Sequence, residues 1–199
     1  MSAGSPLRHV VGLDLSLTAT GIASINLDNG LTEFGLVKSQ RVGDEIVDMV
    51  ARLRTMLAGI NSYMPDRPAL VVIEAPSLRS KYGKPHERAG LWWQTVTWVD
   101  GQGHVVAQAR PRTRAKYVAG HLPVKNSGKG PDKREIVAAS RADFPHHAAL
   151  KNDNVADAFG LARMGARYLG SPIDSSTRHR VEAVAAVQWP KTPTEGMNQ

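Results

Sequence analysis

Three carboxylates stand at the ends of, or inside, apolar stretches of the sequence. Asp14 follows the run VVGL, Glu74 follows ALVVI, and Asp157 lies in the alanine- and glycine-rich segment NDNVADAFGLA. An ionised carboxylate leaves water only when another group pairs with it, because desolvating an isolated charge costs on the order of several kcal/mol. Hard divalent cations take oxygen ligands, which converging acids would supply. The leading hypothesis is therefore a two-metal site that cleaves phosphodiesters.

Two of these acids are predicted to end neighbouring strands of one sheet. Apolar or β-branched runs predict strands at about 10–15, 22–27, 31–37, 69–73 and 104–109. Apolar spacing and flanking proline or glycine predict helices at about 44–63, 85–98, 111–119, 132–142, 153–169 and 177–187. Asn29-Gly30 is a strong hairpin signal between the second and third strands. A right-handed crossover through the first helix would place Asp14 and Glu74 side by side at the carboxyl ends of parallel strands.

Length and composition fit one globular α/β domain followed by a tail. The chain has 199 residues, 42% of them hydrophobic, which is enough for a full core. It has no cysteine, so disulfides and thiolate zinc sites are excluded. The N-terminal residues lack the hydrophobic run of a signal peptide, and no apolar run approaches the roughly 20 residues that cross a bilayer. We expect a cytoplasmic protein without a membrane partner.

The positive charge is concentrated in the middle of the chain. The formal net charge is +7. Between Arg79 and His146 there are 13 Lys or Arg against 5 Asp or Glu, whereas the rest of the chain has 12 basic and 13 acidic residues. Solubility does not require basic residues to be clustered, because scattered charges would serve it equally well. The clustering therefore favours a polyanionic partner such as nucleic acid.

Four segments of the chain form a set in a particular order and spacing. They are D-L-S-L-T-A-T-G beginning at Asp14, V-V-I-E ending at Glu74, the basic segment GKGPDKREIV (128–137), and Asp157-Ala158 in a late predicted helix. No single segment is specific. Together they resemble the RuvC-type Holliday junction resolvases, which are crossover junction endodeoxyribonucleases of the RNase H-like superfamily.

The resemblance extends from about Val10 to Arg167 and implies a fold. That fold is an RNase H-like three-layer α/β domain, with a five-stranded mixed sheet of order 3-2-1-4-5 flanked by helices. The nuclease domain would occupy 1–170. Residues 171–199 would form a C-terminal tail with one short helix, partly flexible.

The resemblance also implies a homodimer that cuts branched DNA with two Mg²⁺ ions, for which Mn²⁺ can substitute. Asp14, Glu74 and Asp157 match three of the family's four metal-binding acids. The fourth corresponds to Asn154, while Asp153 lies one position earlier. On a helix both the i,i+3 and i,i+4 neighbours of a residue share its face, so Asp153 is the preferred fourth ligand. Coordination by the amide oxygen of Asn154 is the alternative, and helix capping is the alternative role for Asp153.

A two-metal mechanism assigns a role to each of these side chains. Two ions about 3.5–4 Å apart would hold the scissile phosphate, with Asp14 bridging them and Glu74 and Asp157 each completing one. Lys133 matches a lysine of the family's basic segment and would offset charge on the pentacoordinate phosphate, unless it is only a solvated helix lysine. The expected catalytic set is Asp14, Glu74, Asp153, Asp157 and Lys133.

The residues expected to bind DNA lie in the basic middle of the chain. They are Arg79, Lys81, Tyr82, Lys84, Arg112, Arg114, Lys116, Lys125, Lys129, Lys133 and Arg134. Phosphate contacts of this kind give affinity without sequence information and weaken with salt. Many resolvases of this type carry an aromatic residue a few positions after the glutamate, and here the first aromatic is Tyr82, so junction selectivity is less firmly implied than nuclease chemistry. Trp92, Trp93 and Trp98 are assigned to a core or a dimer interface.

Other functions compete with this interpretation. A catalytically weak or inactive dimeric protein that binds branched DNA is one alternative: the intact Asp14, Glu74 and Asp157 count against it, and the unsettled fourth acid keeps it open. An RNA-processing nuclease of the RNase H-like superfamily would keep the acids, although the basic insert argues against it. An ATP-using relative of actin and the sugar kinases would need a second phosphate loop and a chain about twice as long.

Overall fold

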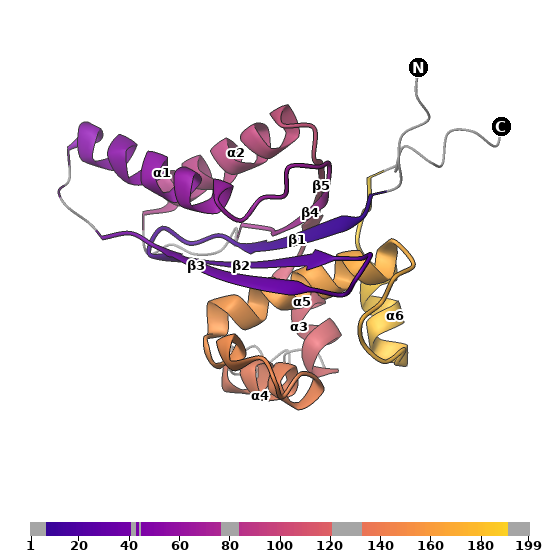
Figure 1. The fold of residues 1–199 in the computed structure, drawn as a ribbon. Coiled ribbons are helices and arrows are strands. Elements are labelled where there is room, and N and C mark those ends of the chain that lie inside the picture. Colours follow the sequence, from indigo (N-terminus) through magenta and orange to yellow (C-terminus); the bar gives the residue numbers. More distant parts are fainter. Residues whose placement is uncertain (1–6, 41–42, 44, 77–83, 121–132, 191–199) are drawn as a thin grey trace, which may run out of the picture.

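Five strands form one mixed sheet in the order β3-β2-β1-β4-β5, which confirms the predicted topology (Figure 1). The computed structural model describes residues 7–40, 43, 45–76, 84–120 and 133–190. The strands are β1 (His9–Asp14), β2 (Ala19–Asn26), β3 (Thr32–Lys38), β4 (Leu70–Glu74) and β5 (Val105–Ala109). The helices are α1 (Ile46–Asn61), α2 (Pro85–Gly101), α3 (Pro111–Ala119), α4 (Lys133–Asp143), α5 (Asp153–Tyr168) and α6 (Arg178–Ala185).

The first three strands form an antiparallel meander, and the last two add to it in parallel. β1 pairs with β2, and β2 with β3, in antiparallel register. The hairpin between β2 and β3 turns at Gly30, whose φ of 72° suits glycine, and Asn29 Oδ1 accepts a hydrogen bond from the Leu31 N–H. After the crossover through α1, β4 pairs with β1 in parallel, and β5 pairs with β4 in parallel.

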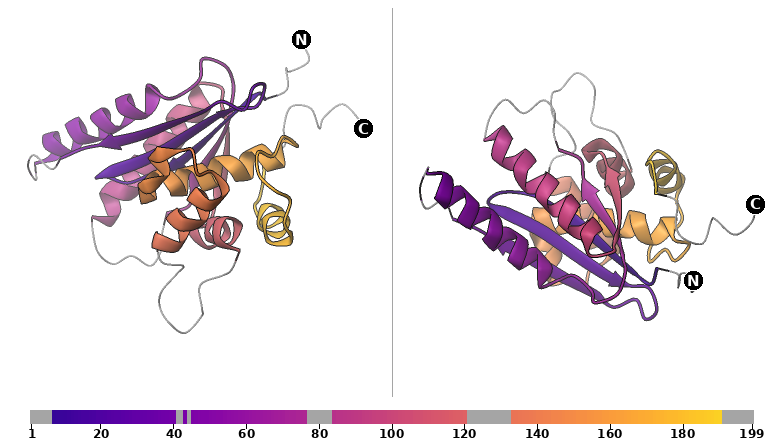
Figure 2. Two further views of the ribbon diagram at one scale, coloured as in Figure 1. Left: turned by 60° about the horizontal axis from the view of Figure 1, so that its bottom comes forward. Right: turned by 90° about the horizontal axis from the view of Figure 1, so that it is seen from above.

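Helices cover both faces of the sheet, so the molecule has three layers (Figures 1 and 2). α1 and α2 run over one face, and α5, α3 and α4 lie on the other. Successive side chains of a strand point to opposite faces. Accordingly Val11 and Leu13 of β1 pack in the core under α1 and α2, whereas Val10 packs in the core around α5. Within the described residues, no helix is both long enough and apolar enough to span a membrane.

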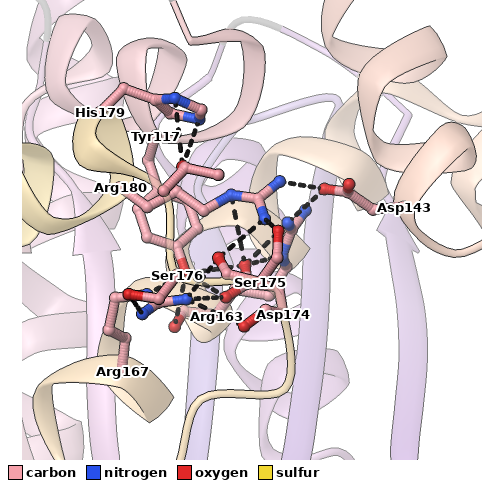
Figure 3. Close-up of polar contacts among 10 residues, drawn as sticks. Tyr117, Asp143, Arg163, Arg167, Asp174, Ser175, Ser176, His179 and Arg180 are labelled. Atoms are coloured by element: carbon pink, nitrogen blue, oxygen red, sulfur yellow. Dashed lines mark hydrogen bonds and ion pairs between the residues drawn. The ribbon is translucent and has the colours of Figure 1, made fainter.

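A buried ion-pair network joins the segment after α5 to the rest of the fold (Figure 3). The side chain of Asp174 is only 1% exposed, and it pairs with Arg163 at 2.7 Å and with Arg167 at 2.5 Å, both from α5. Asp143, the last residue of α4, pairs with Arg163 at 2.5 Å and with Arg180 of α6. α4, α5, α6 and the segment before α6 are thereby tied together by charge.

Candidate active site

Asp14 and Glu74 lie next to each other at the carboxyl ends of two parallel strands. The register between β1 and β4 pairs Leu13 with Ile73, so the two acids are the next residues on their strands. Leu13 and Ile73 both pack toward α1 and α2. Because side chains alternate along a strand, both acids project to the opposite side, toward α5. This is the juxtaposition that the sequence predicted.

Asp157 reaches the same point from α5, because this helix lies very close to the sheet. A Cβ atom on Gly12 of β1 would lie 2.0 Å from the carbonyl oxygen of Ala158. A Cβ atom on Gly21 of β2 would likewise lie 2.0 Å from the carbonyl oxygen of Asn154. Only glycine allows so close an approach of two backbones. The two glycines therefore set the height of α5 above the sheet and bring Asp157 to the other two acids.

A buried arginine lies between two of the acids. Arg114 Nε donates a hydrogen bond to Glu74 Oε2 at 2.5 Å, and Arg114 Nη1 donates one to Asp157 Oδ1. The expectation that Arg114 contacts DNA from the surface does not match this position, because its side chain is only 10% exposed. Arg114 shares the inward face of α3 with the buried residues Ala115 and Val118, and that face carries its guanidinium into the acid cluster.

The three carboxylates carry more negative charge than Arg114 balances. Burial raises the pKa of Asp14 to about 8, and the nearby charges of Glu74 and Asp157 add to the effect. Burial also raises the pKa of Asp157 to about 7, although Arg114 opposes this rise. Burial lowers the pKa of Arg114, but the neighbouring carboxylates more than reverse that effect, so its pKa is raised. The cluster is thus an oxygen-rich site that is short of positive charge.

The hydroxyl residues of the first motif build the turn that follows Asp14. Thr20 Oγ1 donates a hydrogen bond to the carbonyl of Ser16 at 2.9 Å and accepts one from the Ser16 N–H at 3.1 Å. Ser16 and Thr18 share a further hydrogen bond between their hydroxyl groups at 3.1 Å. These contacts close the turn between β1 and β2, so the motif holds Asp14 at the end of its strand.

In the observed arrangement, Arg114 links Glu74 and Asp157. Within the described residues, no three His, Asp or Glu side chains are grouped so that they could hold a metal ion as they stand. Glu74 and Asp157 each direct one carboxylate oxygen to the guanidinium of Arg114. The site therefore has the ligand types for a divalent cation, with an arginine among them.

Two solved structures share this arrangement of strands and helices. One is Thermus thermophilus RuvC in complex with a Holliday junction substrate, with a TM-score of 0.57, 15% sequence identity, and coverage of 82% of this chain and 97% of that one. The other is a structure of Thermus thermophilus RuvC with a TM-score of 0.56, 16% identity and the same coverage. The fold is that of RuvC. No family model matches the chain, and no curated protein matches it.

Within this RuvC fold, Asp153 lies one helical turn before Asp157 and pairs with Lys133 at the start of α4. The hydrogen bond from Lys133 lowers the pKa of Asp153. Asn152 is the residue that caps α5, because its Oδ1 accepts a hydrogen bond from the Val155 N–H at 3.2 Å. Asp153 therefore is not the helix cap; its carboxylate is paired with Lys133, and its charge acts on Asp157 at the edge of the acid cluster.

The residues expected to bind DNA fall into two groups. Arg79, Lys81, Tyr82, Lys125 and Lys129 lie outside the described residues. Those that the structure describes are Lys84, Arg112, Arg114, Lys116, Lys133 and Arg134. Arg112 is exposed on α3, two residues before Arg114. Lys116 pairs with Glu182 of α6 at 2.7 Å, an exposed contact that leaves its ammonium group near the surface.

One tryptophan has a positioning role that the sequence did not reveal. Trp92 Nε1 of α2 donates a hydrogen bond to the backbone carbonyl of Glu74 at 3.0 Å. Its ring packs against the core under α2, as does that of Trp98. Trp92 therefore fixes the end of β4, from which the Glu74 carboxylate projects. Trp93, by contrast, is 62% exposed.

Proposed function

We propose that this protein is a metal-dependent, structure-selective endonuclease that cuts branched DNA such as Holliday junctions. The observation that carries the proposal is the meeting of Asp14, Glu74 and Asp157, from β1, β4 and α5, at one point of a RuvC fold. One of the two RuvC structures with this fold is bound to a Holliday junction. The shared fold supports the proposal of a nuclease, and the acid cluster would supply the carboxylate ligands for metal-dependent phosphodiester cleavage.

The acid cluster fits a divalent cation on two grounds. All of its candidate ligands are carboxylate oxygens, which Mg²⁺ and Mn²⁺ prefer. In addition, three carboxylates face one guanidinium; burial is the main cause of the raised pKa values of Asp14 and Asp157, and the charge of Glu74 adds to both rises. Asp14, Glu74 and Asp157 would hold the metal, with Asp153 or Asn154 as a further ligand. Bound Mg²⁺ would supply a water of lowered pKa and stabilise charge on the reacting phosphate.

The protein's own residues have distinct tasks in this proposal. Asp14 lies at the centre of the cluster, where its carboxylate feels the charges of both other acids. Trp92 and the turn through Ser16 and Thr20 hold the two strand ends in place. Lys133 lies beside Asp153 at the rim, where its ammonium group could meet a phosphate oxygen.

The basic residues supply affinity for the DNA backbone rather than sequence selectivity. Arg112 is exposed on α3, the helix that carries Arg114 into the acid cluster, and Lys116 is one turn further along the same helix. With Lys84 and Arg134, these side chains would contact phosphates on either side of the cut. The basic segments outside the described residues would extend this contact surface.

A homodimer would present two such sites to the two strands that must be cut in a junction. We place the dimer contact on the exposed apolar side chains of α1 and α2. Trp93 is 62% exposed, and Ile46 and Val47 at the start of α1 are 82% and 69% exposed. Leu57, Trp93 and Trp98 line a surface hollow of about 410 Å³ between the two helices. Trp93→Glu should yield monomers in light scattering after gel filtration, whereas the control Val181→Glu on α6 should not.

The proposal is tested by the range of DNA structures that the protein cuts. The purified protein is incubated with Mg²⁺ and a synthetic four-way junction, a fork, a flap or a linear duplex. Symmetrically paired nicks in the junction that ligase can seal, with the duplex left intact, are the expected result. Equal cutting of forks and flaps would keep the nuclease and remove junction selectivity. Tight, salt-sensitive binding without any cleavage would instead support an inactive protein that binds branched DNA. The contacts of Arg114 with Glu74 and Asp157 are the observation that favours this alternative.

A further inference from the structure

Arg114 occupies the space between two acids that are also the best candidate metal ligands. Its Nε bonds to Glu74 and its Nη1 to Asp157, so one guanidinium bridges two acids from different elements. A planar guanidinium with several fixed donors suits such bridging better than a lysine would. The side chains of Glu74 and Asp157 are 17% and 12% exposed, so solvent screens these contacts only weakly.

The packing around Arg114 leaves room for its stem. A Cβ atom on Gly160 of α5 would lie 2.7 Å from Val118 Cγ2 and 3.4 Å from Arg114 Cγ. The absence of a side chain at position 160 thus lets α3 lie against α5 at this point. Arg114 enters the cluster from a buried helix face, and its position does not depend on an exposed, freely rotating side chain.

The balance of charge suggests what this arginine does. Asp14, Glu74 and Asp157 would carry three negative charges when ionised, and the guanidinium of Arg114 offsets one of them. Without Arg114, the acids would repel one another at close range with little solvent between them. With Arg114 in place, Glu74 and Asp157 each have one carboxylate oxygen bonded to the guanidinium, and a metal ion would need those oxygens as ligands.

We propose that Arg114 is the resident counter-ion of the acid cluster and competes with the divalent metal for Glu74 and Asp157. This inference rests on the proposed function, because it assumes that the acids bind metal. In the metal-free protein, Arg114 holds the acids together. When metal binds, the guanidinium gives up at least one of its two contacts, which lowers the apparent affinity for the metal. The released group then lies next to the site where the phosphate would be.

The test compares wild type with Arg114→Met and Arg114→Lys. Methionine keeps much of the buried aliphatic part of the side chain without the charge. Lysine keeps the charge but lacks the planar guanidinium that can bridge two carboxylates. Mn²⁺ binding is measured by isothermal titration calorimetry, and the melting temperature is measured in EDTA and in Mn²⁺. Arg54→Met removes an exposed arginine from α1, on the other face of the sheet, and serves as the control.

Arg114→Met should bind Mn²⁺ about tenfold or more tightly than wild type, because the competing cation is gone and the acids repel one another. Its melting temperature should fall in EDTA and recover on adding Mn²⁺ by more than that of wild type. Arg114→Lys should lie between the two, and it decides the question alone if Arg114→Met does not fold. Affinity that is unchanged or weaker in both variants, with wild type binding Mn²⁺, would overturn the inference and leave the metal site standing.

The remaining outcomes separate this inference from the proposed function. If neither wild type nor the variants bind Mn²⁺, the metal site fails and the inference fails with it. If wild type binds no Mn²⁺ but Arg114→Met does, Arg114 blocks the site outright. That result would support competition in its strongest form and favour the inactive DNA-binding alternative for the wild-type protein.

Discussion

Gly21 of β2 lies directly against the backbone of Asn154 in α5. A Cβ atom on Gly21 would lie 2.0 Å from the carbonyl oxygen of Asn154 and 2.9 Å from the amide nitrogen of Val155. These are backbone atoms of a helix that is buried almost all round, so they cannot move aside singly. The geometry of the acid cluster therefore depends on a glycine that carries no functional group.

Gly21→Ala should displace α5 from the sheet and move Asp157 away from the strand acids. Forcing extra volume into a well-packed interior typically costs about 1–3 kcal/mol. We expect the free energy of unfolding in urea to fall by about that amount and junction cleavage to fall by more than the loss of folded protein explains.

Gly90→Ala is the matched control for that substitution. Gly90 lies inside α2, and a Cβ atom there would meet no described atom within 4 Å. Replacing glycine by alanine inside a helix should stabilise the protein by up to about 1 kcal/mol. If Gly21→Ala behaved like Gly90→Ala, the claim that the close approach of α5 positions Asp157 would be wrong.

The metal-free protein should become less stable as the pH rises. A carboxyl group whose pKa is higher in the folded chain favours folding below its unfolded pKa, and that contribution is lost as the pH rises through the folded pKa. For Asp14 the pKa rises from 3.8 to about 8, and for Asp157 from 3.8 to about 7. The melting temperature in EDTA should therefore fall between about pH 5 and about pH 8, and Mg²⁺ should restore it.

Asp14→Asn provides the comparison for this pH dependence. The substitution removes one of the repelling charges, so the variant should melt above wild type at about pH 8 in EDTA. Each kcal/mol corresponds to about 2–4 °C for a chain of this size. The loss of melting temperature with pH should also be shallower. Parallel curves for the two proteins would mean that Asp14 is not the group that titrates.

The network around Asp174 should contribute strongly to stability. Asp174→Asn would leave the guanidinium groups of Arg163 and Arg167 with one buried anion fewer. Removing one partner of a buried ion pair typically costs about 3–5 kcal/mol. Urea denaturation should show this loss for Asp174→Asn and little change for Asp66→Asn, whose side chain is exposed. Equal stability of the two variants would show that the network in Figure 3 contributes little.

Arg112 should contribute to DNA binding through the phosphate backbone. Arg112→Ala should weaken binding to a four-way junction and reduce the slope of log affinity against log salt by about 1, because one phosphate contact fewer releases fewer counterions. Arg54→Ala on α1 should leave both quantities near wild type. A loss of affinity in Arg112→Ala that is the same at every salt concentration would point to a structural effect instead.

The sheet could be predicted from the sequence because the residue pattern of each strand indicates whether one or both of its faces are buried. β1 and β4 are buried on both faces and read as continuous apolar runs, and Asn29-Gly30 marks the hairpin. The crossover rule then placed Asp14 beside Glu74 without any three-dimensional information. The sequence pattern was less informative for α1, where Ile46 belongs to the apolar stripe but is 82% exposed.

The position of Arg114 could not be predicted in the same way. In the sequence it is one of four basic residues at alternate positions from 110 to 116, and basic residues usually face water. The helical spacing of Ala115 and Val118 indicates a buried face of α3, but not that a charge on this face meets partners from β4 and α5. The role of Gly21 could not be predicted either, because the sequence does not show that the backbone of α5 lies directly against β2 at this residue.

Asp14, Glu74 and Asp157, which come from three different elements, should act as one catalytic site. The most direct measurement is the rate of junction cleavage in Mg²⁺ by Asp14→Asn, Glu74→Gln and Asp157→Asn, with Asp100→Asn, an exposed acid of α2, as the control. Each of the first three should lose cleavage by a factor of about 10² or more while still binding the junction, and Asp100→Asn should cut like wild type. Cleavage at the wild-type rate in any one of the three variants would show that this acid is not part of the catalytic site.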